Sequence, residues 1–325
     1  MRVLVTGVAG FIGSHLAHAL LRAGTAVVGI DNLNDYYDPA LKKARLARLQ
    51  EQPGFDFRRL DIADRQAVAD LFADFPSIGR VAHLAAQAGV RYSLENPLAY
   101  IRSNVQGHVV LLEEARRLPG LEHFVYASSS SVYGGNKKRP FAEDDRTDTP
   151  VSLYGATKKA MEVLSESYAS MYRMPLTGLR FFTVYGPWGR PDMAVWIFTR
   201  KIFAGEALPI FNYGKQRRDF TYIADIVRGI TACLERPPAA DAEGPHRVLN
   251  LGNNRPTGVL DLVRVLEDAI GIKAELDYQP HQAGDVTETH ADIERARDLL
   301  GFVPSTRLDE GIPTFVDWYR EYHRL

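Results

Sequence analysis

The sequence of 325 residues is poor in cysteine and has no excess of either charge. Its one cysteine, Cys233, cannot form an internal disulfide, and no cysteine cluster is present that would hold zinc. The 39 Lys and Arg residues balance 40 Asp and Glu residues, whereas a protein that binds nucleic acid usually carries a basic excess. We therefore expect no disulfide scaffold, no metal site and no nucleic-acid partner.

Long apolar runs are absent as well, and none approaches the roughly 18–20 residues that span a bilayer. Met1 and Arg2 lead directly into a short apolar run and a glycine turn, which is not the pattern of a secretory signal. With 46% apolar and 24% charged residues, the composition is that of a globular protein. We expect a soluble, cytoplasmic protein without a membrane partner, and its length suggests two domains.

Short apolar runs alternate with helical patterns through the first 180 residues. Such runs are typical of buried strands, and their alternation with helices predicts an α/β fold in which helices cover both faces of a parallel sheet. The expected strands are Arg2–Thr6 and residues 26–30, 57–61, 81–85, 124–128 and 176–182, and the expected helices are residues 11–23, 65–75, 98–118 and 151–173.

A glycine-rich turn joins the first expected strand to the first helix. Gly7, Gly10 and Gly13 are spaced three apart, with Phe11 and Ile12 between the last two. Glycine permits the tight turn and lets backbone N–H groups approach a pyrophosphate, while the helix N-terminus adds its dipole. In the first βαβ unit of a chain, this pattern predicts a dinucleotide-binding site.

Asp31 ends the second expected strand, eighteen residues after Gly13. A carboxylate there can accept hydrogen bonds from an adenosine ribose diol and repels a 2′-phosphate, which favours NAD over NADP. Lys42 and Lys43 lie downstream and could weaken this discrimination. Asp61 and Ile62, which we place at the end of the third strand, are candidates to hold the adenine.

The organisation of the chain changes near residue 180. Residues 32–54 are too long for a bare loop and are expected to carry a helix, and after residue 180 the strand patterns become short. We expect a doubly wound, Rossmann-type NAD-binding domain over residues 1–180, with a returning strand near residues 246–252. A smaller α/β substrate domain is expected over residues 181–325.

Tyr154 and Lys158 are four residues apart, and therefore share one face of an expected helix. An ammonium and the positive ring of an oxidised nicotinamide both favour the phenolate of a tyrosine, which can then exchange a proton with a sugar hydroxyl. Residues 128–131 are four serines at the carboxyl end of a strand, where ligands bind in open α/β sheets. We choose Ser129 as the hydrogen-bond partner of the reacting oxygen.

Together these motifs resemble the extended short-chain dehydrogenase/reductases, in particular the nucleotide-sugar epimerases and dehydratases. The resemblance runs through the whole chain and includes His-Leu-Ala-Ala at residues 83–86 and Arg-Asp-Phe-Thr-Tyr-Ile at residues 218–223. Within this group the chain is most similar to the epimerases that act on UDP-glucuronate. The segments that carry this similarity are residues 31–38, 87–93, 128–134 and 179–193.

The resemblance implies an isomerase that uses NAD to invert C4 of UDP-glucuronate, giving UDP-galacturonate through a transient 4-keto sugar without net redox. A carboxylate beside that ketone readily loses carbon dioxide, so an epimerase must restrain it. Relatives that decarboxylate carry Glu where this chain has Ser131, which argues against decarboxylation. The alternatives are a UDP-glucose or UDP-GlcNAc 4-epimerase, a UDP-glucuronate decarboxylase, and a binding module that has lost catalysis.

The resemblance also implies roles for single residues. Asn32, Leu84, Ala85 and Ala86 join the NAD site, where Lys158 also bonds the nicotinamide ribose. Ser130, Ser131 and Thr183 are candidates to restrain the carboxylate, Arg218 to bind the diphosphate, and Asp285 to bind the uridine ribose. Further substrate candidates are Phe211, Arg91, Arg190 and Gln282, where many relatives have Arg; Arg91 and Arg190 are equally well interpreted as surface charges.

The helical segments 98–118 and 151–173 pair across a dimer in this family, so the resemblance predicts a homodimer.

Overall fold

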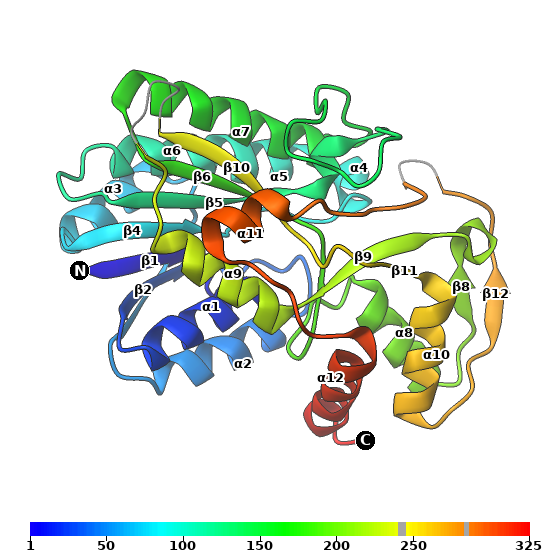
Figure 1. Cartoon of the computed structure of the whole chain (residues 1–325). Helices are drawn as coiled ribbons and strands as arrows, with labels where there is room; N and C mark the ends of the chain where they lie inside the picture. Colours follow the sequence, from blue (N-terminus) through cyan, green and yellow to red (C-terminus); the bar gives the residue numbers. More distant parts are fainter. Residues whose placement is uncertain (240–244, 283–285) are drawn as a thin grey trace.

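The computed structural model describes residues 1–239, 245–282 and 286–325. At its centre lies a seven-stranded sheet in the order β10-β6-β5-β4-β1-β2-β3, in which every neighbouring pair is parallel (Figure 1). The predicted α/β fold is therefore confirmed. The strands are β1 (Arg2–Thr6), β2 (Ala26–Asp31), β3 (Phe55–Arg59), β4 (Ile78–His83), β5 (His123–Ser129), β6 (Leu176–Phe181) and β10 (His246–Leu251).

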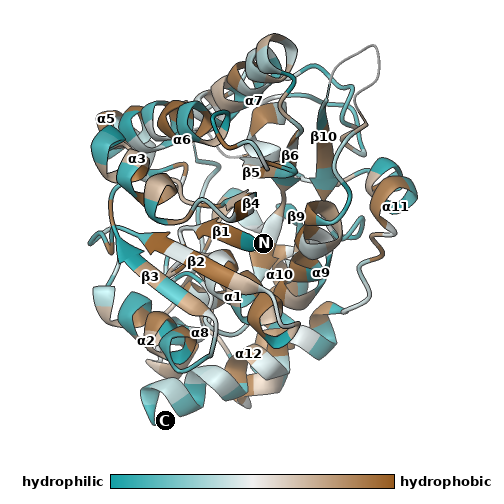
Figure 2. Ribbon diagram, turned by 90° about the vertical axis from the view of Figure 1, so that its left-hand side faces the viewer, coloured by the Kyte–Doolittle hydropathy of each residue, from teal (hydrophilic) through white to brown (hydrophobic). Residues whose placement is uncertain are grey.

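Helices cover both faces of this sheet. Along β1, Val3 and Val5 pack into one apolar cluster and Leu4 into another, because successive side chains of a strand point to opposite faces. Figure 2 shows the largely apolar inner strands of the sheet between the two layers of helices, whose ribbons carry both hydrophobic and hydrophilic residues. On one face lie α1 (Phe11–Arg22), α2 (Pro39–Gln50) and α9 (Ile223–Leu234), and on the other lie α3 (Arg65–Asp74), α6 (Gly107–Ala115) and α7 (Leu153–Tyr172) (Figure 1).

The segment expected as one helix over residues 98–118 has a π-helical turn in it. After the short α4 (Tyr92–Glu95), α5 (Pro97–Tyr100) continues into the π turn η1 (Ile101–Gln106) and then into α6. Asn104 of this turn is buried and bonds the backbone of Gln87 in both directions, with Nδ2 to Gln87 O at 3.0 Å and Gln87 N to Oδ1 at 2.8 Å. The same Nδ2 donates to Thr157 Oγ1 at 3.0 Å. The wider turn thus ties the loop after β4 to α7.

The C-terminal part contributes to two regions. The returning strand predicted near residues 246–252 is β10, and α9 packs into the same apolar cluster as α1. A second region contains two small sheets and a separate apolar cluster. Its elements are β7 (Thr183–Tyr185), α8 (Ala194–Phe203), β8 (Leu208–Ile210), the 3-10 turn η3 (Phe211–Gly214), β9 (Arg217–Tyr222), β11 (Pro256–Gly258), α10 (Val259–Ile270), β12 (Leu276–Tyr278) and α12 (Leu308–His323), with α11 (Glu294–Leu300) beside β10.

A buried ion pair anchors α7 to the sheet. Arg180 of β6 donates to both oxygens of Glu162, from Nε at 2.8 Å and from Nη2 at 2.9 Å. Ser128 Oγ donates to Glu162 Oε1 at 2.7 Å, and Arg180 Nη1 donates to Tyr133 Oη at 2.9 Å. Burial by itself would raise the pKa of Glu162, but the bonds from Arg180 and Ser128 hold it below its usual value. The pair fixes the helix directly behind the carboxyl end of β5.

We expect Arg180→Met to lower the free energy of unfolding by roughly 3–5 kcal/mol, because it leaves the buried Glu162 charge with only the longer, 3.3 Å contact to Lys159. The matched control is Arg295→Met, whose exposed pair with Asp144 should contribute less than about 1 kcal/mol. Urea unfolding followed by circular dichroism measures both. Equal, small losses for the two variants would contradict the anchoring role.

Candidate active site

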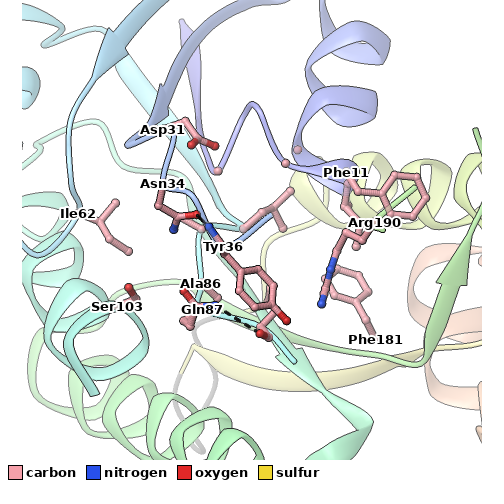
Figure 3. A pocket seen from close by; sticks show the side chains of 18 of the residues that line it. Phe11, Asp31, Asn34, Tyr36, Ile62, Ala86, Gln87, Ser103, Phe181 and Arg190 are labelled. Atoms are coloured by element: carbon pink, nitrogen blue, oxygen red, sulfur yellow. Dashed lines mark hydrogen bonds between the residues drawn. The ribbon is translucent and has the colours of Figure 1, made fainter. Parts of the chain in front are cut away.

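A cleft of about 1350 Å³, its open mouth included, lies at the carboxyl ends of the central strands. Its walls come from the segments that follow β1, β2, β3, β4, β5 and β6. In Figure 3, Arg190 and Phe181 lie on the opposite side of the cleft from Ile62 and Ser103. This is the edge of an open α/β sheet at which ligands bind.

The glycine turn forms one wall of the cleft by close backbone packing. Gly7 has a φ of +69°, and a Cβ there would lie 2.8 Å from the backbone nitrogen of Ala85. A Cβ on Gly13 would overlap the carbonyl of Gly7. Helix α1 begins after Gly10 with no side-chain cap and no acidic residue in its first turn. Its first amides therefore suit an anion such as a diphosphate.

Asp31 is held in place by two backbone amides. Its Oδ2 accepts from Ala9 N at 3.1 Å and its Oδ1 accepts from Leu33 N at 2.8 Å. Burial raises the pKa of Asp31, and the two amides oppose this shift. Lys42 does not bond Asp31; its Nζ donates to the carbonyl oxygen of Asn34 at 2.8 Å and to Asn34 Oδ1 at 2.5 Å. The carboxylate is thus oriented at the cleft, as recognition of a ribose diol requires.

Tyr154, Lys158 and Ser129 meet in this cleft. Helix α7 is capped by Ser152, whose Oγ accepts from Gly155 N at 3.0 Å, so Tyr154 lies in its first turn. Burial raises the pKa of Tyr154, whereas its hydrogen bond with Ser129 and the charge of Arg190 lower it. Lys158 is buried and donates to Ala127 O at 2.7 Å, and this burial lowers the pKa of Lys158 to about 7.

Arg190 reaches the cleft from the loop that follows β7. Its Nε donates to Asp192 Oδ1 at 3.0 Å, and Tyr36 Oη donates to Asp192 Oδ2 at 3.0 Å. Tyr36 belongs to the segment after β2, so this bond joins two segments that are distant in the sequence. The contact places a guanidinium near the phenol of Tyr154.

All the residues predicted to bind the cofactor line this cleft, together with the substrate candidates Ser129, Tyr154 and Arg190. Ser130 and Ser131 follow Ser129 in the 3-10 turn η2 (Ser130–Tyr133), and Thr183 opens β7. These three residues are not among the lining residues of the cleft.

The other substrate candidates lie in or near the C-terminal region. The Arg91 guanidinium lies over the Phe211 ring, 4.9 Å from its centroid. Arg218 lies on β9 and donates from Nη1 to Thr287 O at 3.2 Å. Gln282 is partly exposed. Asp285 lies outside the described residues.

Sequence reasoning passed over several residues of the cleft. Most of them fall in segments 31–38, 87–93 and 179–193, where similarity was noted but single positions carried no recognisable chemistry. Ser103 was missed because it lies in the π turn, whose residues do not follow the helical periodicity used for prediction. The residues concerned include Asn34, Tyr36, Tyr37, Gln87, Ser103, Phe181 and Met193.

Comparison with known proteins identifies the family. The profile of the NAD dependent epimerase/dehydratase family matches residues 3–252. The chain belongs to this family. It is 49% identical over 332 residues to UDP-glucuronate 4-epimerase 4 of Arabidopsis thaliana, a match that covers 99% of this chain and 76% of that protein.

Two solved structures share the fold of this epimerase/dehydratase chain. UDP-glucuronic acid 4-epimerase from Bacillus cereus, in complex with UDP-glucuronic acid and NAD, superposes with a TM-score of 0.91 at 36% identity, covering 99% of this chain and 100% of that one. UDP-glucose 4-epimerase from Thermotoga maritima, with UDP-glucose, superposes with a TM-score of 0.89 at 33% identity, again covering 99% of this chain and 100% of that one. The expected resemblance to nucleotide-sugar epimerases is confirmed.

Two classes of feature are absent from the part of the chain that the structure describes. No helix there has the length and apolar character needed to cross a membrane. Within the same residues, no group of three or more His, Cys, Asp or Glu side chains is arranged to hold a metal ion.

The burial of Lys158 predicts a pH-dependent cost in stability for the ligand-free protein. An unfolded lysine has a pKa of about 10.4, whereas that of Lys158 is about 7. Between these values the unfolded chain holds a proton that the folded chain lacks, so the free energy of unfolding rises with pH across this window. Below pH 7 the full cost of burying the charge is present.

We therefore expect Lys158→Met to raise the free energy of unfolding at pH 6.5 by on the order of 2 kcal/mol, after allowing for the lost bond to Ala127 O. The gain should shrink as the pH approaches 10. Denaturant unfolding at a series of pH values measures it, with the exposed Lys43→Met as control. A destabilised Lys158→Met protein at every pH would contradict this interpretation.

Proposed function

We propose that this protein is an NAD-dependent epimerase that interconverts UDP-glucuronate and UDP-galacturonate by inverting C4. The observation that carries the proposal is the meeting of Tyr154, Lys158 and Ser129 in a cleft that the glycine turn and Asp31 also line. The choice of a uronate rests on the similarity, over nearly the whole chain, to UDP-glucuronate 4-epimerases from a plant and from Bacillus cereus.

NAD, when bound, would supply the acceptor and donor of the C4 hydride. The chain would hold this cofactor with the amides of α1 at its diphosphate and with Asp31 at its adenosine ribose. Asp61 and Ile62 would border the adenine, and Lys158 would bond the nicotinamide ribose. These assignments are supported by the position of each residue on the wall of the cleft.

Tyr154 takes the proton of the 4-hydroxyl and later returns one to O4 of the inverted sugar. Ser129 bonds both Tyr154 and the reacting oxygen, which keeps the two oxygen atoms in contact. In the ligand-free protein burial keeps the pKa of Tyr154 above its usual value, although the bond with Ser129 opposes this shift; the positive ring of a bound oxidised nicotinamide would favour the phenolate. Arg190 lowers this pKa and its ion-pair partner Asp192 raises it, so the two charges of the loop after β7 oppose each other at Tyr154.

The substrate carboxylate must be kept out of the geometry in which the 4-keto sugar would lose carbon dioxide. Ser130, Ser131 and Thr183 are the proposed hydroxyl donors for this purpose; they adjoin the lining residues Ser129 and Phe182 in the sequence without lining the cleft themselves. Arg218, Phe211 and Gln282 would bind the UDP part within a substrate domain that begins near residue 181. The alternative substrate is a neutral UDP-hexose, as in the similar UDP-glucose 4-epimerase of Thermotoga maritima.

A homodimer is the proposed assembly. Adjacent elements on one side of the molecule leave large apolar side chains exposed, among them Leu94 (75%) and Leu98 (76%) before η1, and Val163 (58%) and Met171 (59%) on α7. Large apolar side chains that are exposed on neighbouring helices support an interface on this side of the molecule. We place the dimer in the cytoplasm, where the predicted cofactor and substrate are available.

Incubation with UDP-glucuronate, without added reductant, tests the reaction. We expect proton NMR to show UDP-galacturonate growing to a fixed ratio. Tyr154→Phe should lower kcat by at least about 100-fold, because general acid–base catalysis typically contributes 10²–10⁴-fold, while NAD stays bound. A pentose product would indicate decarboxylation, and conversion of UDP-glucose alone would overturn the uronate assignment.

The dimer is tested by charges placed on the apolar surface. We expect the double variant Leu98→Asp/Val163→Asp to be a monomer in sedimentation-velocity experiments, because a buried unpaired carboxylate is strongly unfavourable. Val303→Asp, at an exposed apolar side chain elsewhere, should leave the sedimentation coefficient unchanged. An unaltered dimer in the double variant would place the interface on another surface.

A further inference from the structure

Arg45 is a fully buried charged side chain that the proposed chemistry does not use. It lies on α2, the helix within the segment that interrupts the alternation of strands and helices. Its side chain has no exposed surface and is the first in size among the fully buried side chains. A charged side chain is rarely buried in this way unless hydrogen bonds compensate it, because removing the charge from water is costly.

The guanidinium joins three separate segments of the chain. Towards the loop after β7, Nε and Nη2 donate to the carbonyl of Trp188 at 3.1 and 2.5 Å, and Nη2 donates to the carbonyl of Gly189 at 2.8 Å. Towards the glycine turn, Nη1 donates to the carbonyl of Ala9 at 3.2 Å. Nη1 also donates to Tyr37 Oη at 2.7 Å. Only a planar fork of several donors can make all these bonds at once.

Every one of these acceptors is uncharged. Within the described ranges, no carboxylate forms a salt bridge with Arg45, so its positive charge is not neutralised by direct contact. That charge lies immediately behind Ala9, in the turn whose next residues open α1 towards the cleft. The turn therefore has a fixed positive charge on the side away from the cleft, in addition to the helix dipole.

The segment pinned by Arg45 is the one that leads to Arg190. Trp188 has a φ of +61°, and its ring packs against Trp318 of α12 with 5.2 Å between ring centroids. The carbonyl groups of Trp188 and Gly189, which accept from Arg45, come directly before Arg190, whose side chain lines the cleft. A shift of Arg45 would therefore move the glycine turn and the Arg190 loop relative to each other.

We propose that Arg45 is a positioning residue that couples the NAD-binding turn to the Arg190 loop, which closes the substrate end of the cleft. The inference rests on the proposed function for the identity of the two ligands. The positive charge of Arg45 supports binding of the cofactor diphosphate. The several N–H donors of its guanidinium hold the Arg190 loop in the position that the sugar requires. These two contributions are separable, because lysine keeps the charge but has no fork.

The test compares Arg45→Met, Arg45→Lys and Arg48→Met by calorimetric titration of the full chain with NAD alone. Arg48 is the matched control, since it lies on the same helix with its guanidinium 4.7 Å from the Trp188 ring centroid, without a bond to the glycine turn. We expect Arg45→Met to weaken NAD binding at least about tenfold, Arg45→Lys to weaken it about threefold, and Arg48→Met to change it less than twofold.

Steady-state kinetics at saturating NAD provide the second readout. Both Arg45 variants should raise the KM for UDP-glucuronate about fivefold or more and change kcat less than about threefold, because Tyr154 and Lys158 are held by other contacts. A residue that merely stabilises the fold would lower the melting temperature without this division between KM and kcat.

Two results would overturn the proposal. One is an Arg45→Met protein, folded by circular dichroism, whose NAD affinity and KM equal those of Arg48→Met. Should Arg45→Met fail to fold, Arg45→Lys decides, since wild-type NAD affinity and KM in that variant would exclude coupling through the fork. An enzyme that leaves UDP-glucuronate unchanged, yet loses NAD affinity on mutation of Arg45, would reject the proposed function and support the role of Arg45 in the NAD site.

Discussion

The ion pair between Glu162 and Arg180 is the contact on which the reactive end of the cleft depends. It holds α7 against β6 from within the core, and Glu162 also accepts a bond from Ser128, the residue before Ser129. Tyr154 and Lys158 lie on the helix fixed by this pair. A buried pair of this kind adds little net stability over an apolar replacement, so its value to the molecule is the defined position of a helix and a strand end.

A second feature of the site is that two buried basic side chains, Lys158 and Arg45, have no carboxylate partner in direct contact among the described residues. Lys158 bonds only neutral groups, and the bonds of Arg45 go to carbonyls and a phenol. Each such charge costs stability in the ligand-free protein. Both lie beside a cleft whose proposed ligands, NAD and a UDP-sugar acid, are anions. The cost of burying these basic groups would be offset when those ligands bind.

Agreement between the sequence and the fold is closest where local patterns have one structural solution. The apolar runs became the strands of one parallel sheet, and the Gly7–Gly13 spacing produced the turn that lines the cleft. Agreement was poorer for the segment expected as one helix, because apolar periodicity does not distinguish an α-helix from one with a π turn at Asn104. The contact between Tyr36 and Asp192 could not be predicted from the sequence, since the two residues are 156 positions apart.

The sequence by itself determined the parallel α/β architecture and placed the proposed reactive pair, Tyr154 and Lys158, on one helix. These features are short-range patterns that the local backbone geometry decides directly. The glycine spacing gives the turn, Asp31 marks the end of a strand, and the spacing of four places Tyr154 and Lys158 on one helix face. Only the tertiary structure decided that Arg45 is buried and that it joins the glycine turn to Trp188. Such contacts depend on packing between segments brought together by the whole sheet, and no pattern of neighbouring residues encodes them.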